Sequence, residues 1–346
     1  MKTPIKKLSL LVFVLGWVLV GQVAKATETN TPASNNVKVA VIDLFDDSRQ
    51  RPVKILLWYP ANAQCEKAAI CLAKNTNPQQ TAVISHGAMG SAKEYNWLGY
   101  ALASQGIVTV GVNHFGESWI YGPDKVDPSA ALRFNLRPQD ISFVLNQLSE
   151  NKIDANSQGR IFDKPLNWQN VTAIGHSSGG ASVLSLAGAE FDFAQAQPYC
   201  ATDAAKADKS CAYLAFLKPS SQLPAPTAPF TDKRIKRVIT MDPALGHVVT
   251  QKSLNNIKVP VLVIGSKRND FLPFATHAGF YADHIRTAKR QVLDNGEGHF
   301  VYLDKCVHAY DALGVPLCKD AEGVDRDGVH KGLYPVIFGF IYSTAN

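Results

Sequence analysis

The chain has 346 residues, 46% of them hydrophobic and 18% charged, and a formal net charge of +6. Four of its 35 basic residues lie in an N-terminal segment that is expected to be removed, which leaves 31 basic against 29 acidic residues. A net charge near +2, with no block of like charges and no internal repeat, argues against a nucleic-acid-binding protein.

The N-terminus has the pattern of a secretory signal peptide. Lys2, Lys6 and Lys7 precede an apolar run over residues 8–20, and Ala24-Lys25-Ala26 follows it. This run of about 13 residues is shorter than the roughly 20 that a membrane-spanning helix needs. We therefore predict cleavage after residue 26, export to the periplasm or the medium without a stable membrane anchor, and one domain over residues 27–346.

Six cysteines fall into three local pairs. Because disulfides are permitted in exported proteins and sequence neighbours are easily joined, we predict Cys65–Cys71, Cys200–Cys211 and Cys306–Cys318. No CxxC spacing is present, so the sequence indicates no structural zinc site, and no metal or cofactor is expected.

Short apolar runs alternate with segments of helical spacing along most of the chain. Residues 37–45 and 52–60 predict an opening hairpin, since both runs have strand length and stop at turn residues. Six further runs predict strands of a mostly parallel central sheet flanked by helices. These runs are "TAVISHG", "GIVTVGVNH", "VTAIGHS", "RIKRVITMD", "KVPVLVIGS" and "KRQVLDN".

Two long segments interrupt this alternation. Residues 115–128 form a long loop, and residues 190–232 form a Pro-rich insertion that follows a helix near residues 181–188. Long loops in compact domains are often binding loops or lids. Trp119, Tyr121 and the "LAFL" of the insertion are candidates to line a cleft, or they are ordinary packing residues.

The segment "VTAIGHSSGG" contains Gly-x-Ser-x-Gly between a predicted strand and a predicted helix. In this arrangement the serine occupies a sharp, strained turn, and glycines on both sides let the strand and the helix approach each other. Ser177 is therefore the candidate nucleophile. The backbone N–H of Ser178 is a candidate oxyanion donor, and the N–H of Ala88, in the loop "ISHGAMGS", is the second.

A nucleophilic serine needs a base and an orienting acid, in the chain order Ser, Asp or Glu, His. His299 is the candidate base because it lies in a Gly-rich loop directly after the last predicted strand; His308 and His330 are weaker alternatives. Asp270 and Asp242 each follow a predicted strand and either could orient the histidine. Asp270 is preferred because its loop position is the one used most widely in this kind of fold.

These motifs resemble those of α/β-hydrolases in the group that joins platelet-activating-factor acetylhydrolases, predicted dienelactone-hydrolase-like proteins and bacterial cutinase-like polyester hydrolases. The matching segments are "SHGAMGS", "LASQGIVTVGVNH", "RPQDISFVLNQL", "GHSSGG", "MDPALG" and "GEGHF". In the acetylhydrolases the acid is placed like Asp242, and in the cutinase-like enzymes like Asp270. Dienelactone hydrolases proper use a cysteine nucleophile, from which Ser177 departs.

The expected function is hydrolysis of a small-molecule or lipid carboxylic ester, with acetyl or short acyl groups, phospholipids and polyesters as possible substrates. Amide or lactone hydrolysis is an alternative on the same groups. A binding protein that keeps the fold without the chemistry is an alternative from a different class. An interface-dependent lipase would need an exposed apolar lid, which the polar, Pro-rich insertion does not promise.

Overall fold

The computed structural model describes residues 36–62, 68–152, 160–216, 230–306 and 310–343. The predicted signal peptide lies outside these residues, and so do part of the insertion (217–229) and Cys65. None of the helices in the described ranges is long and apolar enough to cross a membrane.

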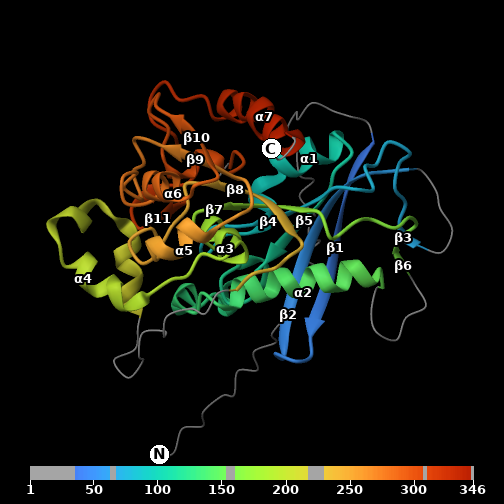
Figure 1. Ribbon diagram of the computed structural model, residues 1–346, viewed down its shortest axis with the longest axis horizontal. Helices are drawn as coiled ribbons and strands as arrows, with labels where there is room; N and C mark the ends of the chain where they lie inside the picture. Colours follow the sequence, from blue (N-terminus) through green and yellow to red (C-terminus); the bar gives the residue numbers. More distant parts are fainter. Residues whose placement is uncertain (1–35, 63–67, 153–159, 217–229, 307–309, 344–346) are drawn as a thin grey trace, which may run out of the picture. The chain divides into compact units, whose positions relative to one another are not determined.

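An eight-stranded sheet forms the centre of the fold, in the order β1-β2-β5-β4-β7-β8-β9-β10 (Figure 1). Its strands are β1 (Val37–Asp46), β2 (Arg51–Pro60), β4 (Thr81–Ser85), β5 (Val108–Asn113), β7 (Val171–His176), β8 (Ile235–Met241), β9 (Val261–Ser266) and β10 (Ala288–Leu293). The pairs β1–β2 and β2–β5 are antiparallel and all others are parallel. The predicted hairpin and parallel sheet are confirmed, and this topology is that of an α/β-hydrolase.

Helices cover both faces of the sheet. The α-helices are α1 (Asn96–Ser104), α2 (Leu136–Glu150), α3 (Ser178–Leu186), α4 (Ala196–Cys200), α5 (Gln251–Asn256), α6 (Ala278–His284) and α7 (Arg326–Tyr342). Apolar residues of α1 and α7 pack into one core cluster, and those of α2, α3, α5 and α6 pack into another on the opposite face. Every residue of β4, β5 and β7 is buried, so these strands have no exposed polar face and their sequences are rich in apolar, small and β-branched residues.

Short elements complete the chain. The minor strands are β3 (Ala68–Ile70), β6 (Arg160–Phe162), β11 (Asp311–Ala312) and β12 (Val315–Pro316). The 3-10 helices are η1 (Ala92–Tyr95), η2 (Trp119–Tyr121), η3 (Pro123–Lys125), η4 (Pro128–Leu132), η5 (Phe193–Gln195), η6 (Asp203–Ala207), η7 (Lys209–Phe216) and η8 (His299–Tyr302). The described part of the insertion is therefore folded into α4 and three of these 3-10 helices.

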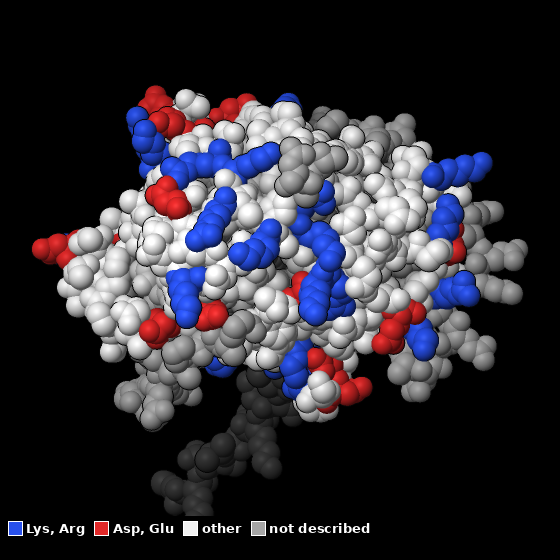
Figure 2. All heavy atoms as spheres, in the orientation of Figure 1, with Lys and Arg blue, Asp and Glu red and all other residues white. Residues whose placement is uncertain are grey.

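Two of the predicted disulfides are present, Cys200–Cys211 within the insertion and Cys306–Cys318 around β11 and β12. Cys71 is also disulfide-bonded, and its predicted partner Cys65 lies outside the described residues. Figure 2 shows lysine and arginine side chains scattered among uncharged surface on the face in view, with acidic side chains mostly toward its edges.

Candidate active site

Ser177 lies at the sharp turn between β7 and α3, as the Gly-x-Ser-x-Gly motif predicts. Its backbone angles are φ 55° and ψ −123°, a conformation that residues with a side chain rarely adopt. Two hydrogen bonds hold the turn: the Ser177 N–H donates to the Met241 carbonyl, and the Ala244 N–H donates to the Ser177 carbonyl, each at 3.0 Å. Strain of this kind costs about 1 to 3 kcal/mol and is typical of functional sites.

The glycines of the motif are required by close contacts. A Cβ atom on Gly175 would lie 2.1 Å from the Gly179 carbonyl oxygen, and one on Gly179 would lie 2.0 Å from the Ser85 carbonyl oxygen. Neither neighbour is a flexible side chain that could move aside. The elbow therefore brings helix α3 against the ends of β4 and β7, as the motif predicts.

Ser177 opens into a cavity of about 310 Å³ that is lined mainly by apolar side chains. His299, Ala88 and Ser178 line the same cavity, so the structure brings four of the predicted site residues together. The insertion contributes Leu214 and Phe216 from the "LAFL" segment, whose last residue lies outside the described range.

The two aromatic candidates of the 115–128 loop are not among the residues that line this cavity. The Tyr121 hydroxyl accepts the Lys54 N–H at 2.6 Å and donates to the Asn113 carbonyl at 2.9 Å, which is a packing role. The Trp119 indole N–H donates to Glu94 at 3.1 Å. Glu94 does line the cavity, and burial raises its pKa to about 7.

His299 begins the 3-10 helix η8 and is buried beside the cavity, where its ring stacks on Phe271. Its Nδ1 atom lies 3.2 Å from the amide nitrogen of Asn269 and 3.7 Å from Asp242 Oδ2. Burial lowers the pKa of His299 to about 3, so the imidazole is neutral and able to accept a proton. Among the described residues, no hydrogen bond joins its ring to the Ser177 hydroxyl.

The two candidate acids contact different parts of His299. Asp242 follows β8, accepts the Ser266 N–H at 2.8 Å through Oδ1, and turns its buried Oδ2 toward the imidazole. Within the described residues this Oδ2 has no hydrogen-bond partner, and burial raises the pKa of Asp242 to about 8. Asp270, the acid preferred from the sequence, accepts the backbone N–H of His299 at 2.9 Å. The alternative acid, Asp242, thus lies beside the imidazole without a hydrogen bond to it, whereas Asp270 bonds the main chain of His299 and is the charge that most raises the pKa of its ring.

The other histidine candidates differ in outcome. His330 in α7 is hydrogen-bonded to the Val301 carbonyl at 2.8 Å and stacks on Trp97, a packing role. His308 lies outside the described residues. His176, within the elbow, lines the cavity but bonds Tyr95 and the main chain of His299.

A buried ion pair supports the loop that carries Ala88, and sequence reasoning missed it. Arg137 and Glu117 form two hydrogen bonds of 2.9 Å, and both side chains are almost fully buried. Arg137 also donates to the carbonyls of His86 (2.7 Å) and Gly87 (3.2 Å). The available signal was Arg137 at the start of α2 in "RPQD", but Asp140, three residues later, offered a local partner and the pairing with Glu117 was not foreseen.

A second Ser-His-Asp chain, also missed, lies inside the protein. The Ser85 hydroxyl is 3.0 Å from His114 Nε2, and His114 Nδ1 is 3.0 Å from Asp140 Oδ2. Arg51 binds the same carboxylate. Ser85 is fully buried and lines neither described pocket, so this chain joins β4, β5 and α2 and has no access to substrate.

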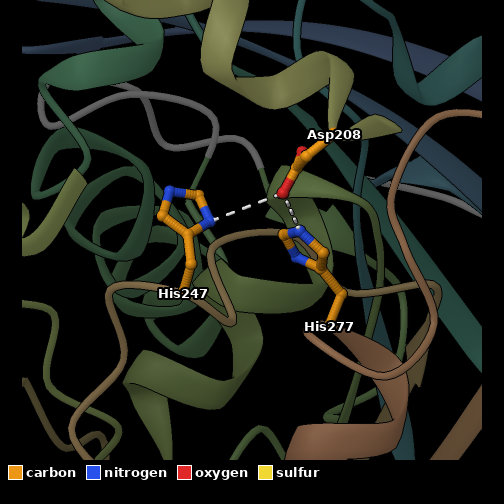
Figure 3. Close-up of side chains that lie close together, drawn as sticks. All are labelled: Asp208, His247 and His277. Carbon is orange, nitrogen blue, oxygen red and sulfur yellow. Dashed lines mark hydrogen bonds and ion pairs between the residues drawn. The ribbon is translucent and has the colours of Figure 1, made fainter. Parts of the chain in front are cut away.

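Asp208, His247 and His277 form the one group in the described residues that could hold a metal ion (Figure 3). Asp208 Oδ2 lies 2.7 Å from His277 Nε2 and 3.9 Å from His247 Nδ1. The Gly246 N–H donates to His277 Nδ1, so Nε2 must carry the proton and donate it to Asp208. A metal-binding nitrogen needs a free lone pair, and the donor set therefore does not fit a metal.

The same cluster instead attaches the insertion to the sheet. Asp208 lies in the insertion, and His277 and His247 lie in loops after β9 and β8. The Asp208 carboxylate also accepts bonds from the Tyr199 hydroxyl at 3.0 Å and from Ser210. Although burial by itself raises the pKa of Asp208, its hydrogen bonds, above all that from His277, hold it at about 2. Residues of this segment, among them Ser210 and Tyr213, form part of the wall of the cavity.

No family model matches the chain, and no curated protein matches it. Similar solved structures include a ferulic acid esterase from Streptomyces cinnamoneus, with 20% identity, coverage of 80% of this chain and 78% of that chain, and a TM-score of 0.47. A predicted CIB-like hydrolase from Thermoplasma acidophilum has 13% identity, coverage of 87% and 100%, and a TM-score of 0.44.

At this level of similarity neither protein informs the activity of this chain. The likeness to acetylhydrolases, dienelactone-hydrolase-like proteins and cutinase-like enzymes remains one of sequence motifs. The topology of the sheet and the elbow at Ser177 identify the chain as an α/β-hydrolase fold.

Proposed function

We propose that the protein is a serine hydrolase of carboxylic esters, with Ser177 as nucleophile and His299 as general base. The observation that carries the proposal is the strained Ser177, which opens into the apolar cavity that His299 also lines. The turn itself needs only a small residue that tolerates a positive φ, so its geometry alone does not explain why the residue is a serine. At this turn the Ser177 hydroxyl would face an ester carbonyl bound in the cavity.

Asp242 is the acid that fits this mechanism best, in preference to Asp270. In the resting structure Asn269 donates to His299 Nδ1, because the Asn269 carbonyl oxygen is already bonded to the N–H groups of Phe271 and Leu272. A small shift of the ring toward Asp242 would exchange this bond for one to Oδ2. With Asp242 ionised, as it is above its pKa of about 8, the imidazole proton would then lie on Nδ1, and Nε2 would be free to accept the Ser177 proton.

In the reaction, Ser177 Oγ attacks the ester carbonyl while His299 takes its proton and then returns it to the leaving alcohol. Water next attacks the acyl-enzyme, with His299 again as base. The N–H groups of Ala88 and Ser178 would bind the oxyanion. Ser178 is the first residue of α3, where an N–H has no partner inside the helix.

The cavity favours esters with an apolar group, since its walls combine Leu132, Leu214, Phe216 and Phe271 with few polar side chains. The signal-peptide pattern, together with the two disulfides, supports an exported enzyme. The proposed chemistry needs only the side chains and N–H groups named above.

The test is labelling with a fluorophosphonate, alongside hydrolysis of p-nitrophenyl esters of increasing acyl length. Wild-type protein should be labelled, and Ser177→Ala should lose both labelling and turnover while keeping its circular dichroism. Ser182→Ala is a matched control, because Ser182 lies in the same helix and its hydroxyl bonds the Ser178 carbonyl. Folded wild-type protein that neither labels nor turns over would contradict the proposal and favour a binding protein.

A further inference from the structure

We propose that Tyr95 and His176 are positioning residues for the reaction proposed above, on which this inference rests. They form one directed chain of hydrogen bonds from the loop that carries Ala88, past the elbow, to the loop that carries His299. His176 bonds the His299 carbonyl, Tyr95 bonds the Gly87 N–H, and the two side chains bond each other.

The direction of the chain is set at His299. His176 Nε2 lies 3.0 Å from the His299 carbonyl oxygen, which can only accept a hydrogen bond. Nε2 must therefore carry a proton. Burial lowers the pKa of His176 well below its ordinary value, so the ring is neutral and its Nδ1 carries a lone pair.

The next two bonds follow from this tautomer. The Tyr95 hydroxyl lies 2.8 Å from His176 Nδ1 and must donate to it. The hydroxyl oxygen is then free to accept, and the Gly87 N–H donates to it at 3.2 Å. Each donor in this chain meets an acceptor, and neither the Tyr95 hydroxyl nor the His176 ring has an alternative assignment.

The chain acts on the peptide that presents Ala88. The Gly87 carbonyl accepts from His86 Nδ1 at 2.6 Å and from Arg137 at 3.2 Å, while the Gly87 N–H is held by Tyr95. A trans peptide is planar and its C=O and N–H point in opposite directions. The Gly87 C=O lies in the same peptide plane as the Ala88 N–H, so the bonds to this carbonyl set the direction of the proposed oxyanion donor. Tyr95 holds the preceding peptide plane and so restricts rotation about the Gly87 backbone between the two planes.

Sequence-local structure places Tyr95 for this task. Tyr95 ends the 3-10 helix η1, whose start has a capping box: Ser91 accepts the Lys93 N–H, and Glu94 accepts the Ser91 N–H, both at 3.1 Å. Tyr95 is fully buried, and His176 is almost fully buried. Removing one side chain of this chain leaves a buried polar group without a hydrogen-bond partner. Keeping the remaining groups in place then costs free energy, so we expect them to shift.

The test is Tyr95→Phe, measured by steady-state hydrolysis of a p-nitrophenyl ester and by the rate of fluorophosphonate labelling. A misaligned oxyanion donor weakens only transition-state binding, so kcat should fall by about tenfold to a hundredfold while KM changes less than about twofold. Labelling should slow in parallel. The pH profile of kcat/KM should keep its shape, since no titrating catalytic group is removed.

Tyr121→Phe is the matched control. Its hydroxyl also accepts a backbone N–H and donates to a carbonyl, but Tyr121 does not line the cavity. This variant should keep wild-type kcat. Equal loss of kcat in both variants, or an unchanged kcat in folded Tyr95→Phe, would overturn the inference.

A double-mutant cycle with His176→Asn provides a second test, which also serves if Tyr95→Phe does not fold. If the two residues act as one chain, each single variant should lower kcat and the double variant should lose little more than the worse single one. An unchanged kcat in His176→Asn, or multiplicative losses in the cycle, would overturn the inference. Wild-type protein that is labelled at Ser177 keeps the proposed function intact in these cases; unlabelled wild-type protein would overturn both.

Discussion

The contact between Asp242 and the His299 imidazole yields a sharp prediction about the two candidate acids. Asp242→Asn removes the carboxyl group that lies 3.7 Å from Nδ1, so above about pH 8, where Asp242 is ionised, kcat for p-nitrophenyl esters should fall by about a thousandfold to ten-thousandfold. At about 1.4 kcal/mol for each factor of ten, this is roughly 4 to 5.5 kcal/mol of transition-state stabilisation. Asp270→Asn keeps a carbonyl oxygen that can accept the His299 N–H, so kcat should change less than about tenfold.

Asp242→Asn should also alter how the free energy of unfolding depends on pH. Burial raises the pKa of Asp242 from 3.8 to about 8, so the folded protein binds this proton more tightly than the unfolded chain. Stability from this group is therefore full below about pH 4 and declines as pH rises toward 8, by an upper limit of roughly 6 kcal/mol. Asp242→Asn should flatten that decline.

Urea unfolding of both variants at pH 5 and pH 8 measures the effect on stability. Initial rates, with the concentration of active sites determined by titration, measure the effect on kcat. Loss of a thousandfold in kcat for Asp270→Asn, with Asp242→Asn near wild type, would refute the assignment. In that case the 3.7 Å contact in the resting structure would have no part in catalysis.

Three further outcomes are expected. The Cys200–Cys211 disulfide joins residues 11 apart in sequence, so Cys200→Ser/Cys211→Ser should lower the free energy of unfolding by about 3 kcal/mol, measured as a lower Tm without reductant. An unchanged Tm would contradict this. Asp208→Ala should lower the free energy of unfolding by about 3 kcal/mol, because it leaves buried donors unpaired. Since the pKa of Asp208 is held at about 2, wild-type protein should lose about 2 kcal/mol as pH falls from 4 to 2, and the variant should not show this loss in acid unfolding. Gly179→Ala should lower Tm strongly, because its Cβ would clash with the Ser85 carbonyl. Gly332→Ala in α7 should raise Tm slightly, because its Cβ meets nothing within 4 Å and alanine favours a helix. Equal changes in Tm for the two variants would contradict the packing argument.

The sequence alone was sufficient for the sheet, the elbow and two disulfides. Strand-length apolar runs and a glycine pattern depend on neighbours in the chain, so β4, β5 and β7 and the turn at Ser177 could be predicted from local spacing. The Cys200–Cys211 and Cys306–Cys318 pairs were accessible for the same reason. The placement of His299 in a loop beside the cavity also followed from its position after the last strand.

Only the tertiary structure decided which groups meet around Ser177. Asp242 and Asp270 both follow strands, and the difference between a contact to the imidazole and one to the main chain depends on how the loops after β8 and β9 pack. Arg137 and Tyr95 reach Gly87 from separate elements, and the ion pair with Glu117 joins residues 20 apart. Local sequence patterns do not predict such contacts. The contacts form only when elements distant in sequence pack together and each buried polar group must find a hydrogen-bond partner.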